Sequence, residues 1–167
     1  MKIKQIAIII GLAITSPLYA QSTAPQTQND DPRQLVEMPP EAQQLMRKDM
    51  LNYLNVLTQI IGFLATDQLN KAAYIAETQM GNSARGKYRG NPMGPGRFMP
   101  YAMHQFGWSL HQAASEFAQI AREGDTKKAL AALQRVTINC MSCHYSYRTR
   151  WSDKMRIIFK TLFKSNI

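Results

Sequence analysis

The sequence predicts an all-α protein, an antiparallel four-helix bundle, on three observations. Four segments carry apolar residues at helical spacings of three and four. Each segment begins or ends at a residue that commonly marks a helix boundary, and no segment shows the alternating pattern of a half-buried strand. Two of the three connections are short, which favours antiparallel neighbours. The length of the chain suits one such domain.

The first 20 residues are expected to be a secretory signal peptide. Lys2 and Lys4 precede an uncharged apolar run over residues 6–15, and the small residue Ala20 follows as a cleavage position. The run has 10 residues, whereas a membrane span needs about 20. We therefore expect cleavage rather than a retained anchor, and a periplasmic mature protein.

Residues 21–37 are polar and rich in Pro, Asn and Asp, so they are predicted to be a flexible leader before a helical domain over residues 38–150. Without Lys2 and Lys4 the chain keeps 18 basic residues against 11 acidic ones, a net charge of +7. This balance favours protein partners with acidic surfaces. Nucleic acid is not expected as a partner, because the chain is exported and carries no basic-aromatic motif of a nucleic-acid module.

The first helix is predicted to begin at Pro39–Glu41, since proline fits the first helical turn. Its apolar stripe is Met46, Met50, Leu54, Leu57, Ile61 and Leu64. Thr66 or Asp67 is the expected cap of the second helix, and Gly81 is expected to end it in a left-handed conformation. The stripe of the second helix is Leu69, Ala72, Ala73, Ala76 and Met80.

Residues 82–100 hold so many Gly and Pro residues that they are predicted to be a long basic loop. The third helix follows over residues 101–122 and is closed by Gly124. Its stripe is Met103, Phe106, Leu110, Ala114, Phe117 and Ala121. Asp125 or Thr126 is expected to cap the fourth helix. The stripe of that helix is Leu130, Leu133, Thr137, Cys140, His144 and Tyr147.

Residues 151–167 are predicted to be a basic amphipathic extension. The favoured interpretation is a continuation of the last helix that packs on the bundle or on a second subunit. The alternative is a segment that rests on a membrane surface.

The strongest chemical signal is the sequence Cys140-Met-Ser-Cys143-His144, a C-x-x-C-H motif. Two thiols at this spacing can each add to one vinyl group of the same porphyrin, and the adjacent imidazole can bind the iron. We therefore expect one covalently attached haem c per chain, with His144 as a metal ligand. A zinc site would need about four ligands, and a thioredoxin-like redox pair would need a preceding strand; neither pattern is present.

The residues from Cys140 to Arg148 resemble the C-terminal signature of the cytochrome c-prime family, the class II c-type cytochromes. The resemblance covers roughly residues 38–150, and the extension beyond Arg150 departs from it. It implies that Arg148 lies near the haem propionates, a role that suits a guanidinium. It also suggests a homodimer through the first two helices.

The resemblance further implies that the first helix presents one residue to the second face of the iron. The candidates are Met50, which is preferred, and Met46, although methionines on a helical stripe commonly only fill the core. A methionine ligand would suit a periplasmic electron carrier without substrate turnover, and hence not an enzyme. Without such a ligand, the protein would be a five-coordinate binder of small gases such as nitric oxide.

Overall fold

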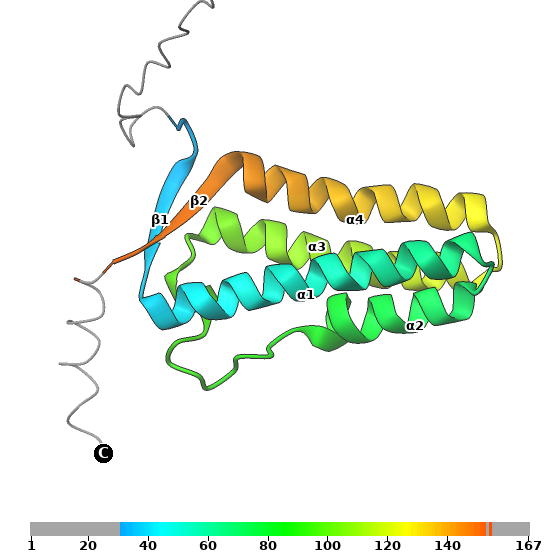
Figure 1. Cartoon of the computed structure of the whole chain (residues 1–167), viewed down its shortest axis with the longest axis horizontal. Coiled ribbons are helices and arrows are strands. Elements are labelled where there is room, and N and C mark those ends of the chain that lie inside the picture. Colours follow the sequence, from blue (N-terminus) through cyan, green and yellow to red (C-terminus); the bar gives the residue numbers. More distant parts are fainter. Residues whose placement is uncertain (1–30, 153, 155–167) are drawn as a thin grey trace, which may run out of the picture. The chain divides into compact units, whose positions relative to one another are not determined.

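The computed structural model describes residues 31–152 and residue 154. Within these residues four α-helices pack alongside one another (Figure 1), which confirms the prediction of a mostly helical protein with four helices. Their bounds are α1 Pro40–Ala65, α2 Leu69–Met80, α3 Tyr101–Arg122 and α4 Thr126–Ser146. The expectations for the signal peptide, for residues 21–30 and for residues 155–167 lie outside the described residues. No helix in the described part is long and apolar enough to cross a membrane.

The starts of α1 and α4 follow the sequence, whereas both ends of α2 depart from it. Pro39 precedes α1 and the Asp125 carboxylate accepts a hydrogen bond of 3.0 Å from the Lys128 amide at the start of α4, both as predicted. The start of α2 has no side-chain cap. Gly81 is extended, with φ −74°, so its predicted left-handed conformation was wrong.

The end of α2 is closed by the Gly81 amide, which donates to the Ala76 and Glu77 carbonyl oxygens, and by side chains from α3 and the following loop. The Nδ1 atom of His111 lies 2.8 Å from the Met80 carbonyl oxygen and donates to it. Glu77 accepts a hydrogen bond of 2.6 Å from the Ser115 hydroxyl and further bonds from the amide and hydroxyl of Ser83. The bond from His111 satisfies the Met80 carbonyl oxygen at the end of the helix, and the bonds to Glu77 tie this end to α3 and to the loop.

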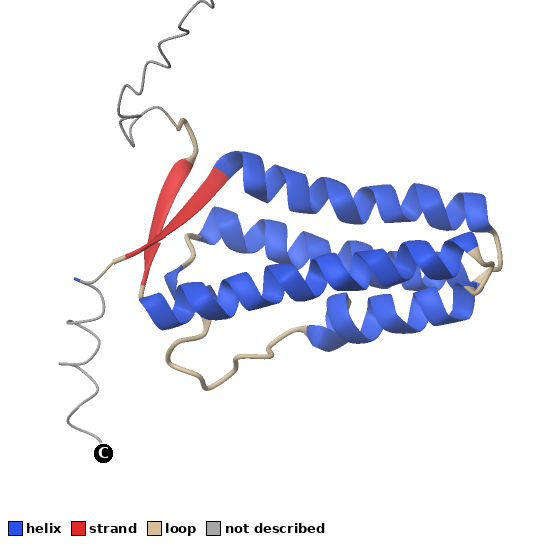
Figure 2. Cartoon of the chain, in the orientation of Figure 1, coloured by secondary structure: helices blue, strands red, loops and turns tan. Residues whose placement is uncertain are grey.

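Two short strands, shown in Figure 2, pair in parallel beside the helices. They are β1 Gln34–Met38 and β2 Tyr147–Trp151. Two expectations were therefore wrong: residues 34–37 are not a flexible leader, and the last helix ends at Ser146 rather than near Arg150. The physical reason is pairing between segments more than 100 residues apart, which local periodicity does not reveal.

The buried residues form two groups. The main core lies between the four helices and includes Phe117, Ile60, Met80 and Val136. The second group, called the end cluster here, joins the strands to the ends of the helices. Its buried members are Val36, Met38, Ala42, Met46, Met103 and Tyr147.

The helix α2 has 12 residues, whereas α1 has 26. Residues 82–100 follow α2 with short 3-10 turns at Asn82–Ala84 and Pro95–Phe98 and no α-helix, as predicted. Their last part packs against the end cluster through Phe98 and Met99. The loop therefore connects α2 to the end of the molecule that carries the strands.

The predicted apolar stripes differ in how deeply they are buried. All stripe residues of α2 are buried, and so are five of the six on α3. On α1 and α4, by contrast, part of each stripe is exposed, including Met50, Leu54, Ile61 and Leu130. The sequence therefore marks an apolar flank on α1 and on α4 that the packing of the helices leaves uncovered.

Candidate haem-attachment site

The C-x-x-C-H motif lies in the last two turns of α4. The Cys140 side chain packs against the main core, and its thiol donates to the Val136 carbonyl oxygen at 3.6 Å. The Cys143 side chain packs against the end cluster. Both thiols are free. The motif therefore sits where the two apolar groups meet, and each thiol is half-buried.

Burial raises the pKa of both thiols. For Cys143, the neighbouring Cys140 adds to the effect of burial; for Cys140, burial outweighs a backbone hydrogen bond that acts in the opposite direction. Both groups are therefore protonated at neutral pH. A reactive redox cysteine has the opposite property, a lowered pKa. A protonated thiol supplies both atoms, S and H, that add across a vinyl double bond.

The His144 side chain is exposed beside the two cysteines. Its backbone oxygen accepts a bond of 3.3 Å from Arg33, whereas its imidazole makes no hydrogen bond within the described part of the chain. The helix ends two residues later, where the Tyr147 amide donates to the Cys143 carbonyl oxygen. A free imidazole on a helix end is available as a ligand to a metal.

The exposed flank of α1 is the side that carries Met50. Gln43 lies seven residues before Met50, and therefore on the same side of the helix. Its amide donates to the Thr149 hydroxyl at 3.2 Å, in the strand that directly follows α4. This side of α1 is thus turned toward the C-terminal end of α4. Met50 is 38% exposed there, with Leu54 and Ile61 more exposed beyond it.

The corresponding flank of α4 carries His144. Arg135 pairs with Glu116 of α3 at 3.9 Å, which marks the α3 side of the helix. On the opposite side, at successive spacings of seven, four and three residues, lie Leu130, Thr137, Met141 and His144. Leu130 and Met141 are 51% and 49% exposed.

These two flanks border the boundary between α1 and α4, which pack less closely than the other neighbouring helices (Figure 1). Met50, from α1, and His144, from α4, therefore lie on the sides of their helices that meet at one boundary. The apolar residues around them suit the faces of a porphyrin. The two half-buried thiols and the free imidazole on α4 fit a covalently bound haem.

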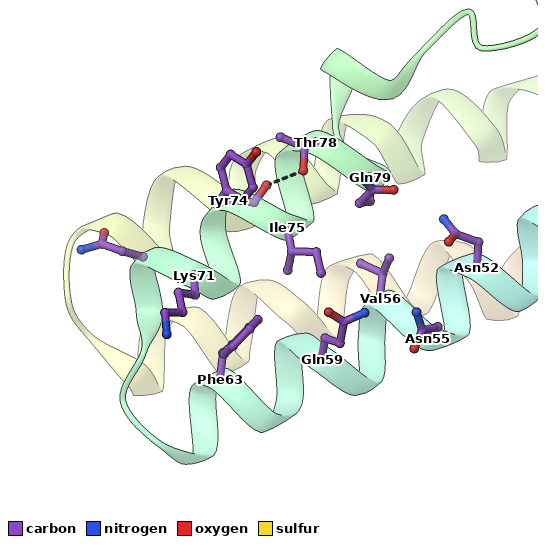
Figure 3. A pocket seen from close by; sticks show the side chains of 11 residues that line it. Asn52, Asn55, Val56, Gln59, Phe63, Lys71, Tyr74, Ile75, Thr78 and Gln79 are labelled. Atoms are coloured by element: carbon purple, nitrogen blue, oxygen red, sulfur yellow. Dashed lines mark hydrogen bonds between the residues drawn. The ribbon is translucent and has the colours of Figure 1, made fainter.

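The side of α1 that faces α2 carries several amide side chains. A pocket open to solvent lies between α1 and α2, shown in Figure 3, and amide side chains line much of it, including Asn52, Asn55 and Gln59. Val56, Phe63 and Ile75 contribute its apolar part. Its lining residues include no cysteine, histidine or methionine. The chemistry of the predicted haem site is thus absent from this pocket.

The structure separates the two candidate methionine ligands. Met46 is only 8% exposed and is packed within the end cluster. Met50 lies on the exposed flank described above. The environment of Met46 is that of a core residue, and the position of Met50 leaves its thioether accessible.

Arg148 lies in β2, beyond the end of α4, whereas the sequence predicted a helical domain through residue 150. Its Nε atom donates to the Arg33 carbonyl oxygen at 3.4 Å. The chain becomes extended from Tyr147 onward because this residue enters the strand and is buried in the end cluster. A contact between Arg148 and the haem propionates stays a prediction.

A polar contact that the sequence did not indicate lies directly beside Met50. Asp49 accepts hydrogen bonds from Lys87 at 2.5 Å and from the Tyr88 hydroxyl at 3.0 Å. The Lys87 ammonium also lies 5.2 Å from the centre of the Tyr88 ring. These residues are 38 and 39 positions from Asp49, so no local pattern predicts their contact. They fasten the basic loop to the first helix.

Among the described residues, no group of three or more His, Cys, Asp and Glu side chains could hold a metal ion. Haem requires fewer ligands from the protein, since the porphyrin itself supplies four of the ligands to iron.

Comparisons with protein-family models, with curated proteins and with solved structures found no match.

Proposed function

We propose that this chain is a periplasmic c-type cytochrome that carries one haem, attached through Cys140 and Cys143, and transfers single electrons. The observation that carries the proposal is the C-x-x-C-H motif on α4, with both thiols free and half-buried between two apolar groups. In this proposal the helices form an antiparallel bundle of the cytochrome c-prime type, and the haem lies beside the last helix.

Each residue of the site has a defined task in this proposal. The cysteines hold the group by two thioether bonds, and His144 provides an imidazole nitrogen to the iron. Met50 provides a thioether sulfur from α1, because its flank borders the same helix boundary. Bound in this way, the haem would supply a one-electron couple whose reduction potential is raised by methionine ligation.

Residues around the proposed site contribute apolar surface and a positive charge. Leu54, Leu130 and Met141 offer apolar surface that would exclude water from the porphyrin faces. Arg148 offers a guanidinium for the propionates. No residue of the site is assigned to the turnover of a substrate, so the protein is proposed to be a carrier rather than an enzyme.

Absorption spectra of the purified protein test the assignment to electron transfer. The protein would be produced in a host that performs c-type haem maturation, and ferric and ferrous spectra would be recorded with and without carbon monoxide. We expect low-spin iron with the ferric band in the red that marks methionine ligation, and slow binding of carbon monoxide limited by loss of the methionine. High-spin iron that binds carbon monoxide directly would instead indicate a gas-binding protein.

A further inference from the structure

The loop over residues 82–100 carries a set of exposed cations and no acidic residue. Arg85, Arg89 and Arg97 are exposed and make no ion pair within the described residues. Among the described residues two carboxylates bond to this loop, Glu77 through Ser83 and Asp49 through Lys87 and Tyr88, and only Asp49 pairs with one of its cations. Lys48, next to it on α1, is also exposed. The loop thus presents a basic surface that the acidic residues of the described part leave largely unpaired.

At the other end of the helices, basic and acidic residues are mixed. Lys128 lies 3.7 Å from Glu123, and the turns there also carry Asp67 and Asp125. The basic loop is therefore a local feature and does not simply reflect the net charge of the whole protein. A concentrated charge of one sign attracts a partner of opposite charge over distances of about the Debye length, roughly 8 Å at physiological salt.

The loop is held in a defined shape. Besides the bonds from Lys87 and Tyr88 to Asp49, the Nε atom of Arg97 donates to the Asn91 carbonyl oxygen at 3.1 Å. Gly86 and Gly90 adopt positive φ angles of 78° and 82°, which glycine accepts without strain. A surface already fixed in this way loses less conformational entropy when a partner binds.

The C-terminal end of the loop and the haem-attachment motif pack against the same cluster. Phe98 and Met99, at its C-terminal end, pack against the end cluster, and Cys143 packs against the same cluster. Asp49, where the loop is fastened, is the residue before Met50. The loop and the proposed haem site therefore lie at the same end of the helices.

We infer that the basic surface formed by Lys48, Arg85, Arg89 and Arg97 is the docking surface for an acidic redox protein. This inference rests on the proposed electron-carrier function and names the surface through which it works. The contact would be small and transient, as in other electron-transfer encounters, and the cations would mainly accelerate association.

The test compares two charge-reversed variants with equal net charge. Arg85→Glu/Arg89→Glu changes the loop, and Lys71→Glu/Lys127→Glu changes exposed lysines on the opening turns of α2 and α4. The reduced, haem-loaded proteins are mixed with ferricyanide, which takes one electron and becomes ferrocyanide. At low salt we expect the loop variant to react about fivefold more slowly than the control variant, with the difference disappearing at high salt. With a cationic cobalt(III) oxidant, the order of the two rates should reverse.

A second readout does not depend on electron transfer. Binding of polyglutamate, an acidic polypeptide, is measured by calorimetry on the same variants, and the loop variant should bind it more weakly than the control. Equal rates and equal binding for the two variants would overturn the docking surface. Retention of the wild-type protein on anionic lipid vesicles without binding to polyglutamate would also overturn it, in favour of a membrane surface. Failure of the proposed function is recognised separately, as purified protein that contains no covalent haem.

Discussion

Replacing Met50 and Met46 separately by alanine distinguishes a ligand from a core residue. Met46 is 8% exposed within the end cluster, and truncation of a buried methionine costs about 2–5 kcal/mol of unfolding free energy. Met50 is 38% exposed, so the loss of buried area alone should cost about 1 kcal/mol. Met46→Ala should therefore destabilise the fold more through lost packing, whereas Met50→Ala should be the variant that changes the ligation of the iron.

Both properties can be measured on the same haem-loaded samples. Met46→Ala should keep the red ferric band of methionine ligation and should unfold at a clearly lower urea concentration. Met50→Ala should lose that band and become high-spin, with loss of the iron–sulfur bond adding to its small cost in packing. The reasoning fails if Met50→Ala retains low-spin iron, or if Met46→Ala loses the band while its stability is unchanged.

Three further predictions concern the fold. Phe117 is fully buried in the main core, so Phe117→Ala should lower the unfolding free energy by about 3–5 kcal/mol in denaturant titrations; a change below about 1 kcal/mol would contradict its place in the core. Burial acts to raise the pKa of Glu77, but hydrogen bonds from Ser115 and Ser83 and the charge of Arg122 together lower it. Because its folded pKa is below the ordinary value of 4.5, Glu77 should stabilise the protein above that pH and lose this effect as the pH falls through the lower folded value. Glu77→Gln should accordingly lower the urea midpoint at pH 7 but not at pH values below the folded pKa, and an equal loss at both would contradict the linkage. Val36 is buried in the end cluster, so Val36→Asp should detach β1 and make the segment before α1 sensitive to limited proteolysis; wild-type resistance would show that the strand pair does not hold this segment.

Much of the helical structure could be predicted from local patterns. The third helix lies at residues 101–122 as expected, because a strong apolar period, Pro100 before it and Gly124 after it all act within a few residues. The cap at Asp125 is similarly local. The site motif could be found because its five residues are contiguous and their spacing follows from the attachment chemistry.

The missed features depend on residues distant in sequence. The strand pairing joins Gln34 to Tyr147, and the loop is fastened by Asp49 and Lys87, so neither contact leaves a periodic signal. The sequence predicts the apolar stripes of α1 and α4, but the helical period alone does not show which residues of a stripe face the core. The structure shows that Met50 lies on the uncovered flank and Met46 in the interior.

The most direct test of the central claim is the mass of the intact protein after denaturation. The chain should be produced in a host that performs c-type maturation and analysed by mass spectrometry after acid-acetone extraction of non-covalent haem. We predict the mass of the mature polypeptide plus one haem, and the mass of the polypeptide alone for the matched variant Cys140→Ala/Cys143→Ala. A wild-type protein whose mass equals that of the unmodified polypeptide would contradict covalent haem attachment at Cys140 and Cys143.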